Sequence, residues 1–334
     1  MTVKRARAKA ADLVAAFRLM LPSPSWSRWL AFIKTWAALP LDEQELAIYR
    51  ACTGRLNPPT ERARRVVALI GRRGGKTRVV AWLGAYLAAF VDHSKVLVPG
   101  EVGVVAIMAP SKAQAGICRR YIEAFFDGEP ALQRMIVRRT ADALDIAGQG
   151  GTLIRVLVIS ASFKLSRGWT LVAFVGDESA FWESESTAAS PDIEIYRSIL
   201  PALATTGGPA ILISTPYAPT GLVYDLHDKH WGRDGDVLVW RADSLTMNPL
   251  LDAKLIEQAY RDDPESASAE YGANFRSDLR SLFAIEALQA CVVAGRRELL
   301  PQAGTVYAAF ADPRGTSRPA RTARSTSPLS KDSP

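Results

Sequence analysis

Short, almost wholly apolar runs alternate with longer amphipathic stretches through the middle of the chain. Runs rich in valine, isoleucine and leucine predict strands at residues 65–70, 102–109, 153–160, 171–177, 210–214 and 237–240. Apolar positions at helical spacing predict helices at residues 76–91, 111–126, 191–203 and 220–231. Strands that are apolar on both faces and separated by helices are typical of a mainly parallel sheet covered on both faces. The pattern therefore predicts an α/β fold.

The segments before and beside these runs have a different texture. Residues 1–57 are predicted to be helical, and they end where Gly54, Pro58 and Pro59 interrupt the pattern. Between the second and third predicted strands, the glycines at 148–151 favour the turn of an added β-hairpin. We see no internal repeat in the sequence.

The C-terminal part returns to helical character and then loses all periodicity. Residues 252–300 are predicted to be helical, and 305–315 has the apolar pattern of a new strand. Residues 316–334 consist largely of serine, threonine, proline and arginine. Such a segment has nothing to bury, so we predict that it is disordered.

The net charge of +7 on the 334 residues changes the picture little once it is located. The segments 1–10 and 313–334 each contribute +4, which leaves about −1 for the body of the chain. A DNA-binding face in the body would therefore have to be a local basic patch. The candidate arginines around the central glycines are Arg62, Arg64, Arg65, Arg72, Arg73 and Arg78.

The cysteine spacing favours a reducing compartment, and the lengths of the apolar runs argue against a membrane span. The three cysteines lie far apart in the sequence, so neither a disulfide framework nor a zinc site is indicated. Asp12 and Arg18 interrupt the apolar start at helical spacing, which is typical of an amphipathic helix and not of a signal peptide. No run approaches the roughly 18 apolar residues of a membrane span. We expect a cytoplasmic protein without a membrane partner.

A glycine-rich loop joins the first predicted strand to its helix in the stretch VVALIGRRGGKTRVVAWL, residues 66–83. Backbone N–H groups and the positive end of a helix dipole converge in such a turn, which suits polyphosphate. Lys76 would reach the β- and γ-phosphates, and the Thr77 hydroxyl would hold Mg²⁺. The strict pattern needs glycine where this chain has Ile70, so the match is to a variant form, and a merely basic turn is the alternative. The other expected phosphate contacts are Gly71, Arg73, Gly74 and Gly75.

Two further predicted strands end in polar residues that complete this chemistry. Asp177 and Glu178 follow a buried strand; Asp177 would support Mg²⁺, and Glu178 would polarise the attacking water as general base. A later strand ends in Ser214, Thr215 and Pro216, beside the expected γ-phosphate. The alternatives are exposed carboxylates in a strand-end turn and a hydroxyl-rich turn fixed by proline.

In this order, GRRGGKT, VGDESAFW and ISTP resemble the ATPase domain of the large terminase subunit of tailed bacteriophages. The resemblance covers roughly residues 30–280. It implies a P-loop NTPase fold, a three-layer αβα sandwich, with ATP and Mg²⁺ as cofactors. It also implies catalytic roles for Arg72, the early arginine of the variant loop, and for Arg167, a finger toward a neighbouring subunit's nucleotide.

The resemblance implies a domain organisation as well. An N-terminal helical region and a P-loop ATPase domain are followed by a helical linker, the start of a ribonuclease-H-like nuclease and the disordered tail. The expected bounds are 1–57, 58–280, 281–304, 305–315 and 316–334.

The nuclease is expected to be incomplete. VYAAFADPRG resembles the first nuclease strand of large terminases, which makes Asp312 the matching first aspartate. A two-metal nuclease needs several carboxylates from later strands. We therefore expect no nuclease activity, and a truncation or frameshift just after Asp312.

Three function classes remain open on the sequence. The first is a DNA-packaging ATPase acting as a homo-oligomeric ring on double-stranded DNA, with the small terminase subunit and the portal of the procapsid as partners. The second is another DNA-stimulated ATPase or helicase. The third is a remnant that binds nucleotide without hydrolysing it.

Two minor candidates complete the sequence-based list. Gln44 is a candidate for reading adenine, or an ordinary exposed helix residue. His227 and His230 lie three positions apart on a predicted helix and could share a metal, although a solvated helix face is the plainer interpretation.

Overall fold

The computed structural model describes residues 3–161, 168–182 and 191–278, together with 290–293, 295–296 and 303–304. The chain divides into two units, Met1–Arg280 and Ser281–Pro334, and the fold described below is that of the first. Among the described residues, none of the helices is both long and apolar enough to cross a membrane.

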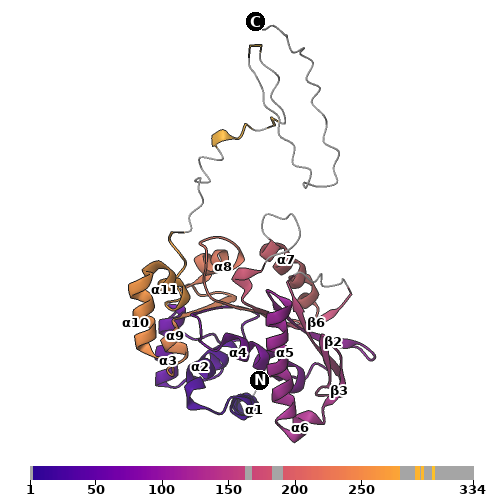
Figure 1. Ribbon diagram of the computed structural model, residues 1–334. Helices are drawn as coiled ribbons and strands as arrows, with labels where there is room; N and C mark the ends of the chain where they lie inside the picture. Colours follow the sequence, from indigo (N-terminus) through magenta and orange to yellow (C-terminus); the bar gives the residue numbers. More distant parts are fainter. Residues whose placement is uncertain are drawn as a thin grey trace. The chain divides into compact units, whose positions relative to one another are not determined.

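A single sheet forms the centre of the first unit (Figure 1). Within the described residues it has eight strands in the order β3-β4-β5-β2-β6-β7-β1-β8. Strands β5, β2, β6, β7, β1 and β8 run parallel, whereas β3 and β4 add an antiparallel edge beside β5. The bounds are β1 Arg65–Ile70, β2 Val102–Ala109, β3 Ile136–Arg139, β4 Ala143–Ala147, β5 Leu153–Ser160, β6 Thr170–Asp177, β7 Ala210–Ser214 and β8 Val237–Ala242.

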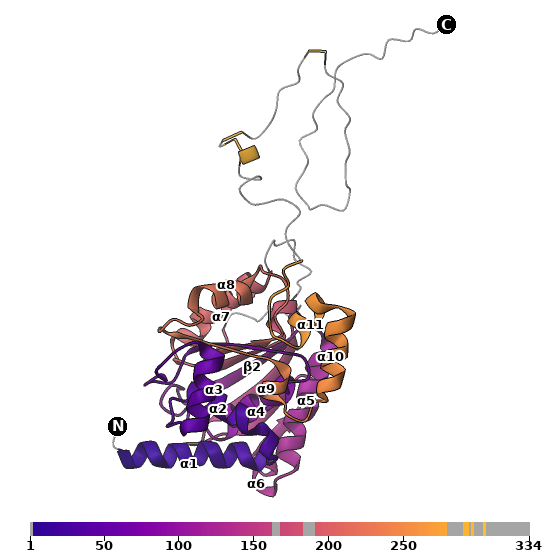
Figure 2. The same ribbon diagram turned by 90° about the vertical axis from the view of Figure 1, so that its left-hand side faces the viewer.

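Helices cover both faces of this sheet. Figures 1 and 2 show α7 and α8 on one side and α2 and α4 on the other. The bounds are α1 Val3–Met20, α2 Ser27–Trp36, α3 Glu43–Thr53, α4 Lys76–Ala89, α5 Lys112–Asp127, α6 Pro130–Gln133, α7 Pro191–Ala204, α8 Leu222–His230, α9 Ser244–Met247, α10 Ala253–Asp262 and α11 Pro264–Glu270. Two short 3₁₀ turns add η1 Pro24–Trp26 and η2 Ser179–Phe181.

Alternation along β1 explains why both faces must be covered. Successive side chains of a strand point to opposite faces. Val66 and Ala68 therefore join the core beneath α1 to α5, whereas Val67 and Leu69 join the core beneath α7 and α8. These positions are apolar on both faces. Leaving either face in water would therefore cost about 25 cal/mol of folding free energy for each Å² of apolar surface exposed.

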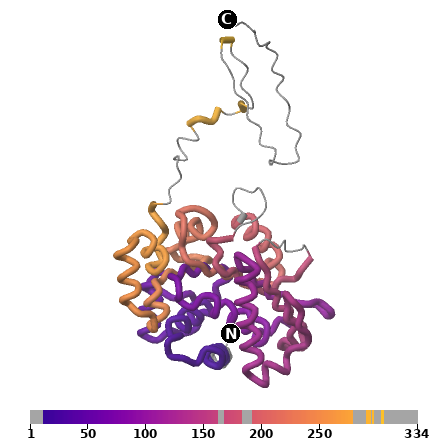
Figure 3. The backbone as a smooth tube through the Cα atoms, viewed as in Figure 1, coloured from indigo at the N-terminus to yellow at the C-terminus, as the bar shows by residue number. Residues whose placement is uncertain are grey.

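The two ends of the unit lie side by side. Helix α9 contacts α2, and the orange trace from α9 to α11 runs beside the indigo N-terminal helices in Figure 3. The loop between β1 and α4 lies at this junction, because residues of both α2 and α9 bond to it, as detailed below. This proximity brings segments about 200 residues apart in sequence to the same strand end.

The predicted α/β fold is confirmed, and the six predicted strands are present. The strand predicted at 171–177 begins one residue earlier, because Thr170 still pairs with Gly103. The strand predicted at 237–240 continues to Ala242, which pairs with Ile70. The predicted hairpin is present as β4 and β5, whereas the additional edge strand β3 was not predicted.

Residues of the N-terminal helices and of the sheet form one shared core, and a substitution of Phe32 tests this. It is fully buried, with its ring edge-on to Trp29 and to Trp240, at 5.5 Å from each. Phe32→Ala removes the bridge between α2 and β8 and should lower the free energy of unfolding by about 3–5 kcal/mol in urea titrations. Leu56→Ala, at a position 74% exposed, is the control and should change it by less than about 0.5 kcal/mol. A Phe32→Ala effect as small as that of the control would contradict a shared core.

Candidate phosphate and catalytic site

The loop between β1 and α4 turns through two positive-φ positions. Arg73 has φ 60° and Gly75, which precedes the first residue of α4, has φ 90°. The first N–H groups of a helix have no intrahelical acceptor and stand at the positive end of its dipole. The turn thus places orphan donors of α4 beside the carboxyl end of β1, an arrangement suited to anions.

The loop's carbonyl groups are held from outside. Three consecutive carbonyl oxygens each accept a hydrogen bond from a side chain of another element. The pairs are Ser244 Oγ to Arg72 O at 2.6 Å, Asn248 Nδ2 to Arg73 O at 2.9 Å and Trp29 Nε1 to Gly74 O at 2.6 Å. With their carbonyls satisfied in this way, the loop residues are fixed without any use of the α4 N–H groups.

Gly71 is required by close approach and not by its φ angle. A Cβ atom here would lie 2.3 Å from Ser244 Oγ and 2.5 Å from the carbonyl oxygen of Tyr271. Both neighbours are fixed, because Ser244 N donates to Tyr271 O at 2.8 Å. The glycine that is displaced by one position from the strict pattern therefore lets α9 and the end of α11 pack directly on the loop.

The ammonium group of Lys76 is buried among oxygen atoms. Its Nζ donates to Thr215 Oγ1 at 2.7 Å and lies 3.2 Å from Glu178 Oε1. It also lies 3.3 Å from the carbonyl oxygens of Ile70 and Gly71. Since the residue is only 6% exposed, these oxygens replace the water that a free lysine would bind.

Glu178 is tied to the end of β7. Its Oε2 accepts the N–H of Thr215 at 2.9 Å and lies 3.4 Å from Ser214 Oγ. Its backbone has φ 45°, in the left-handed region that costs a residue with a Cβ about 1–2 kcal/mol. The lysine pair and the two β7 contacts hold the carboxylate in this strained position.

Asp177 is buried deeper, with 1% of its surface exposed. Burial, and after it the charge of Glu178, raises the pKa of Asp177 to about 7, against the lowering effects of a Thr77 side-chain hydrogen bond and the Lys76 charge. Its Oδ1 is buried and has no hydrogen-bond partner among the described residues. A buried carboxylate oxygen without a partner beside a hydroxyl is an open acceptor position.

The sequence-predicted site residues thus divide into two groups. The structure brings together Lys76, Thr77, Asp177, Glu178, Ser214 and Thr215. It places Arg72 elsewhere: the side chain is 63% exposed and forms an ion pair with Glu270 of α11. Arg73 is also exposed. Arg167 and Asp312 lie outside the described residues.

The minor candidates lie away from this cluster. Gln44 is exposed in the first turn of α3. His227 packs its ring 5.3 Å from that of Phe275 and 5.8 Å from that of Trp231. In the part of the chain that the structure describes, no group of three or more histidine, cysteine or acidic side chains is arranged to hold a metal ion.

A cavity beside the loop was not predicted from the sequence. It has a volume of about 260 Å³ and is lined by Ser23, Ser25, Trp26, Gly74, Gly75, Arg78, Met247, Asn248 and Leu250. The Trp26 ring lies so close to Gly75 that a Cβ there would be 2.7 Å from it. Trp26 is the one aromatic signal in this lining, but its proximity to the loop depends on tertiary contacts that a local sequence pattern does not report.

No protein-family model matches the chain, and no curated protein matches it. Among solved structures it is similar to the large terminase ATPase domain of Thermus phage P74-26, with 21% identity and a TM-score of 0.45 over 73% of this chain and 97% of that one. It is also similar to the large terminase of bacteriophage HK97, with 20% identity and a TM-score of 0.49 over 76% of this chain and 55% of that one. The large terminase of a thermophilic bacteriophage, in complex with ADP, gives 15% identity and a TM-score of 0.45 over 70% of this chain and 53% of that one.

These similarities are to the group of proteins that the motifs predict. The chain spans about half the length of the HK97 terminase and of the terminase solved with ADP. With TM-scores below 0.5, the similarities assign no residue a role, and the roles argued below rest on the geometry of this chain.

The close packing at Gly71 gives a direct test of how the loop is held. Gly71→Ala should lower the free energy of unfolding by about 1–3 kcal/mol, because the added methyl group meets Ser244 and a backbone carbonyl. Gly116→Ala makes the same chemical change in α5, where the nearest atom is 3.8 Å away, and should raise it by about 0.5–1 kcal/mol. Urea unfolding of both variants measures the two signs, and equal effects would show that α9 does not constrain the loop.

Proposed function

We propose that this chain is an ATPase that binds Mg-ATP at the β1–α4 loop and hydrolyses it. The observation that carries the proposal is the convergence of Lys76, Glu178 and Thr215 from the carboxyl ends of β1, β6 and β7. A cation at a helix N-terminus suits phosphates, and a carboxylate within its reach suits the activation of water.

The loop would bind the phosphate groups of ATP. The orphan N–H groups of Gly75, Lys76 and Thr77 would donate to phosphate oxygens, and Lys76 Nζ would exchange its present oxygens for those of the β- and γ-phosphates. Arg73 and Gly74 complete the turn that aims these donors. In this role Lys76 moves its charge by a short distance within one buried cluster.

The residues beside the loop fit a magnesium ion. The Thr77 hydroxyl and the Asp177 carboxylate are hard oxygen ligands, and Asp177 Oδ1 is buried without a partner among the described residues. Thr77 and Asp177 would hold the ion, which neutralises phosphate charge when bound. Its positive charge would also favour the ionised carboxylate in a position where burial now disfavours it.

Glu178 would act as general base. Its carboxylate is now occupied by Lys76 and by the N–H of Thr215. When phosphate takes over Lys76, Glu178 Oε1 becomes free to accept a proton from water that attacks the γ-phosphate. Ser214 and Thr215 would sense this change directly, because both contact the Glu178 carboxylate and Thr215 also accepts a hydrogen bond from the Lys76 ammonium group.

Two arginines have roles that rest on the motif resemblance alone. Arg72 would neutralise developing phosphate charge and would have to leave Glu270 to do so. Arg167 would act as a finger toward the nucleotide of a neighbouring subunit in a homo-oligomeric ring.

The wider role that we propose is DNA packaging. The order of GRRGGKT, VGDESAFW and ISTP supports a motor that couples hydrolysis to the movement of double-stranded DNA. Its partners would be the small terminase subunit and the portal of the procapsid, in the cytoplasm of the host cell.

The cavity beside Gly74 and Gly75 would take the adenine base. Trp26 offers an aromatic face, and the hydroxyl groups of Ser23 and Ser25 offer hydrogen-bonding groups for the base edges. This assignment replaces Gln44, which lines none of that cavity.

Glu178→Gln tests the catalytic assignment. Steady-state ATP hydrolysis with Mg²⁺, measured with and without duplex DNA, should fall by about 10²–10⁴-fold because the amide cannot accept the proton. Nucleotide affinity should change little, since the amide still accepts a hydrogen bond from Thr215. Glu257→Gln, on the exposed face of α10, is the matched control and should keep full activity.

Each result has a distinct meaning. Unchanged turnover in Glu178→Gln would overturn the general-base role. Nucleotide binding by the parent protein without turnover, with or without DNA, would favour the remnant. Stimulation of turnover by duplex DNA would support the motor.

Trp26→Ala tests the base pocket. Loss of stacking should weaken ATP binding about tenfold, within the 1–3 kcal/mol range typical of base–aromatic stacking. The affinity for inorganic pyrophosphate, which has no base, should stay the same in a calorimetric titration. Equal losses for both ligands would show that Trp26 supports the loop at Gly75 and does not contact the base.

A further inference from the structure

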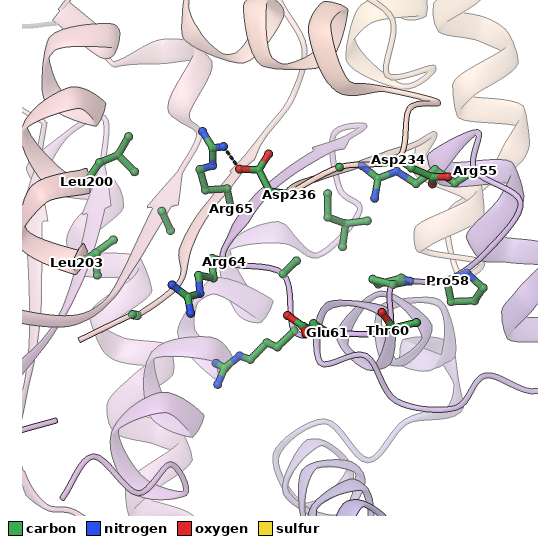
Figure 4. A pocket seen from close by; sticks show the side chains of 18 of the residues that line it. Arg55, Pro58, Thr60, Glu61, Arg64, Arg65, Leu200, Leu203, Asp234 and Asp236 are labelled. Carbon is green, nitrogen blue, oxygen red and sulfur yellow. Dashed lines mark hydrogen bonds and ion pairs between the residues drawn. The ribbon is translucent and has the colours of Figure 1, made fainter. Parts of the chain in front are cut away.

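A second, larger cavity lies at the other end of the strands that carry the nucleotide site (Figure 4). It has a volume of about 660 Å³, and its lining includes Arg65 at the start of β1, Ala210 at the start of β7 and Leu238 of β8. A six-residue strand such as β1 spans about 20 Å, so the cavity is well separated from the phosphate loop. Its volume lies within the roughly 300–1,000 Å³ of small-molecule sites.

The walls combine apolar surface with charge. Leu200 and Leu203 of α7 form one side. The charged residues of the lining are Arg55, Arg62, Arg64, Arg65, Glu61, Asp234 and Asp236, a net charge of +1. The partners of these groups decide which of them are available to a ligand.

Two of the arginines already have partners. Arg65 forms an ion pair with Asp236, drawn as the dashed line in Figure 4. Arg55 is buried and donates from Nη2 to the carbonyl oxygen of Val237 at 2.5 Å. These contacts fix the wall of the cavity along β8, and the ion pair with Arg65 neutralises the charge of Asp236.

The other two, Arg62 and Arg64, form no ion pair with any described residue. The Arg62 guanidinium stacks 4.1 Å above the Trp36 ring, which covers one face, and its in-plane N–H groups form no hydrogen bond with a described residue. Arg64 has an exposed side chain on a fixed backbone, since its carbonyl oxygen accepts the N–H of Ala210 at 2.8 Å. In Figure 4, Arg64 lies on the side of Leu203, well apart from Asp234.

We propose that this cavity is a second phosphate-binding site in which Arg62 and Arg64 contact the phosphate. The planar donor fork of a guanidinium group matches phosphate oxygens in pairs. The wall formed by Leu200 and Leu203 suits the sugar or base that carries the phosphate. Either a free nucleotide or the backbone of DNA supplies this chemistry, and the inference is independent of hydrolysis at the β1–α4 loop.

The test uses the full chain with Lys76→Met, which weakens the first phosphate site. ADP binding is measured by titration calorimetry, and binding of a short fluorescein-labelled duplex by anisotropy. Arg64→Glu should weaken the binding of one of these probes at least about tenfold. The substitution replaces a hydrogen-bond donor to phosphate by a carboxylate, which carries the same negative charge as the phosphate. Arg134→Glu, the same change at an exposed arginine with no ion pair among the described residues, should leave both affinities within about twofold.

The outcomes distinguish a free nucleotide from the DNA backbone as the ligand, and they also show whether the second phosphate site exists. Selective loss of ADP binding identifies a free nucleotide, and selective loss of duplex binding identifies the DNA backbone. If neither probe binds the Lys76→Met protein, or if Arg64→Glu binds both as Arg134→Glu does, the proposal is overturned. Arg62→Gln is the second variant should Arg64→Glu fail to fold, with the same expected loss. Absence of ATP turnover would leave all of these binding results intact.

Discussion

The buried ammonium group of Lys76 is the interaction on which the arrangement of this domain depends. An ion that leaves water without compensation costs several kcal/mol, so its burial requires partners in good geometry. Here they are the carboxylate of Glu178, the hydroxyl of Thr215 and two carbonyl oxygens at the end of β1. These groups belong to β1, β6 and β7 or directly follow them, so the lysine is compensated only when the three strands end together.

The sheet order meets this requirement. Strand β7 lies between β1 and β6, with β8 on the other side of β1, and all of these pairings are parallel. Carboxyl ends of parallel strands meet at one edge, which is where open α/β sheets bind ligands. The loop at that edge is in turn fixed by Trp29 and Ser244, from the two ends of the unit.

The strands, and the polar side chains that meet at their carboxyl ends, could be predicted from the sequence because their signals are local. Continuous β-branched runs locate β1 and β7, and Asp177, Glu178 and Thr215 stand immediately after such runs or at their ends. The supports of the loop could not be predicted in this way. Trp29 bonds to a residue 45 positions away and Ser244 to one 172 positions away, and no periodicity in a sequence reports such contacts.

The ion-pair partner of Arg72 could not be predicted from the sequence either. Its place early in the loop pointed to the phosphates, yet its side chain pairs with Glu270, a residue that approaches only because α11 folds back onto the loop. A charged side chain at the surface takes the nearest opposite charge, and that neighbour is set by tertiary structure.

In the proposed function, phosphate binding and release of the Glu178 carboxylate would be linked, because Lys76 contacts Glu178 and would also contact the phosphate. Lys76 cannot donate to a phosphate group and keep all of its present contacts, so a ligand that takes its ammonium group weakens the hold on Glu178. The carboxylate then keeps the N–H of Thr215, at the end of β7, as its remaining short hydrogen bond. Thr215 follows the five residues of β7, which lead back to Ala210, whose N–H bonds to the carbonyl of Arg64. The proposed nucleotide site and the arginine-lined cavity therefore lie at the two ends of one short, fully buried strand.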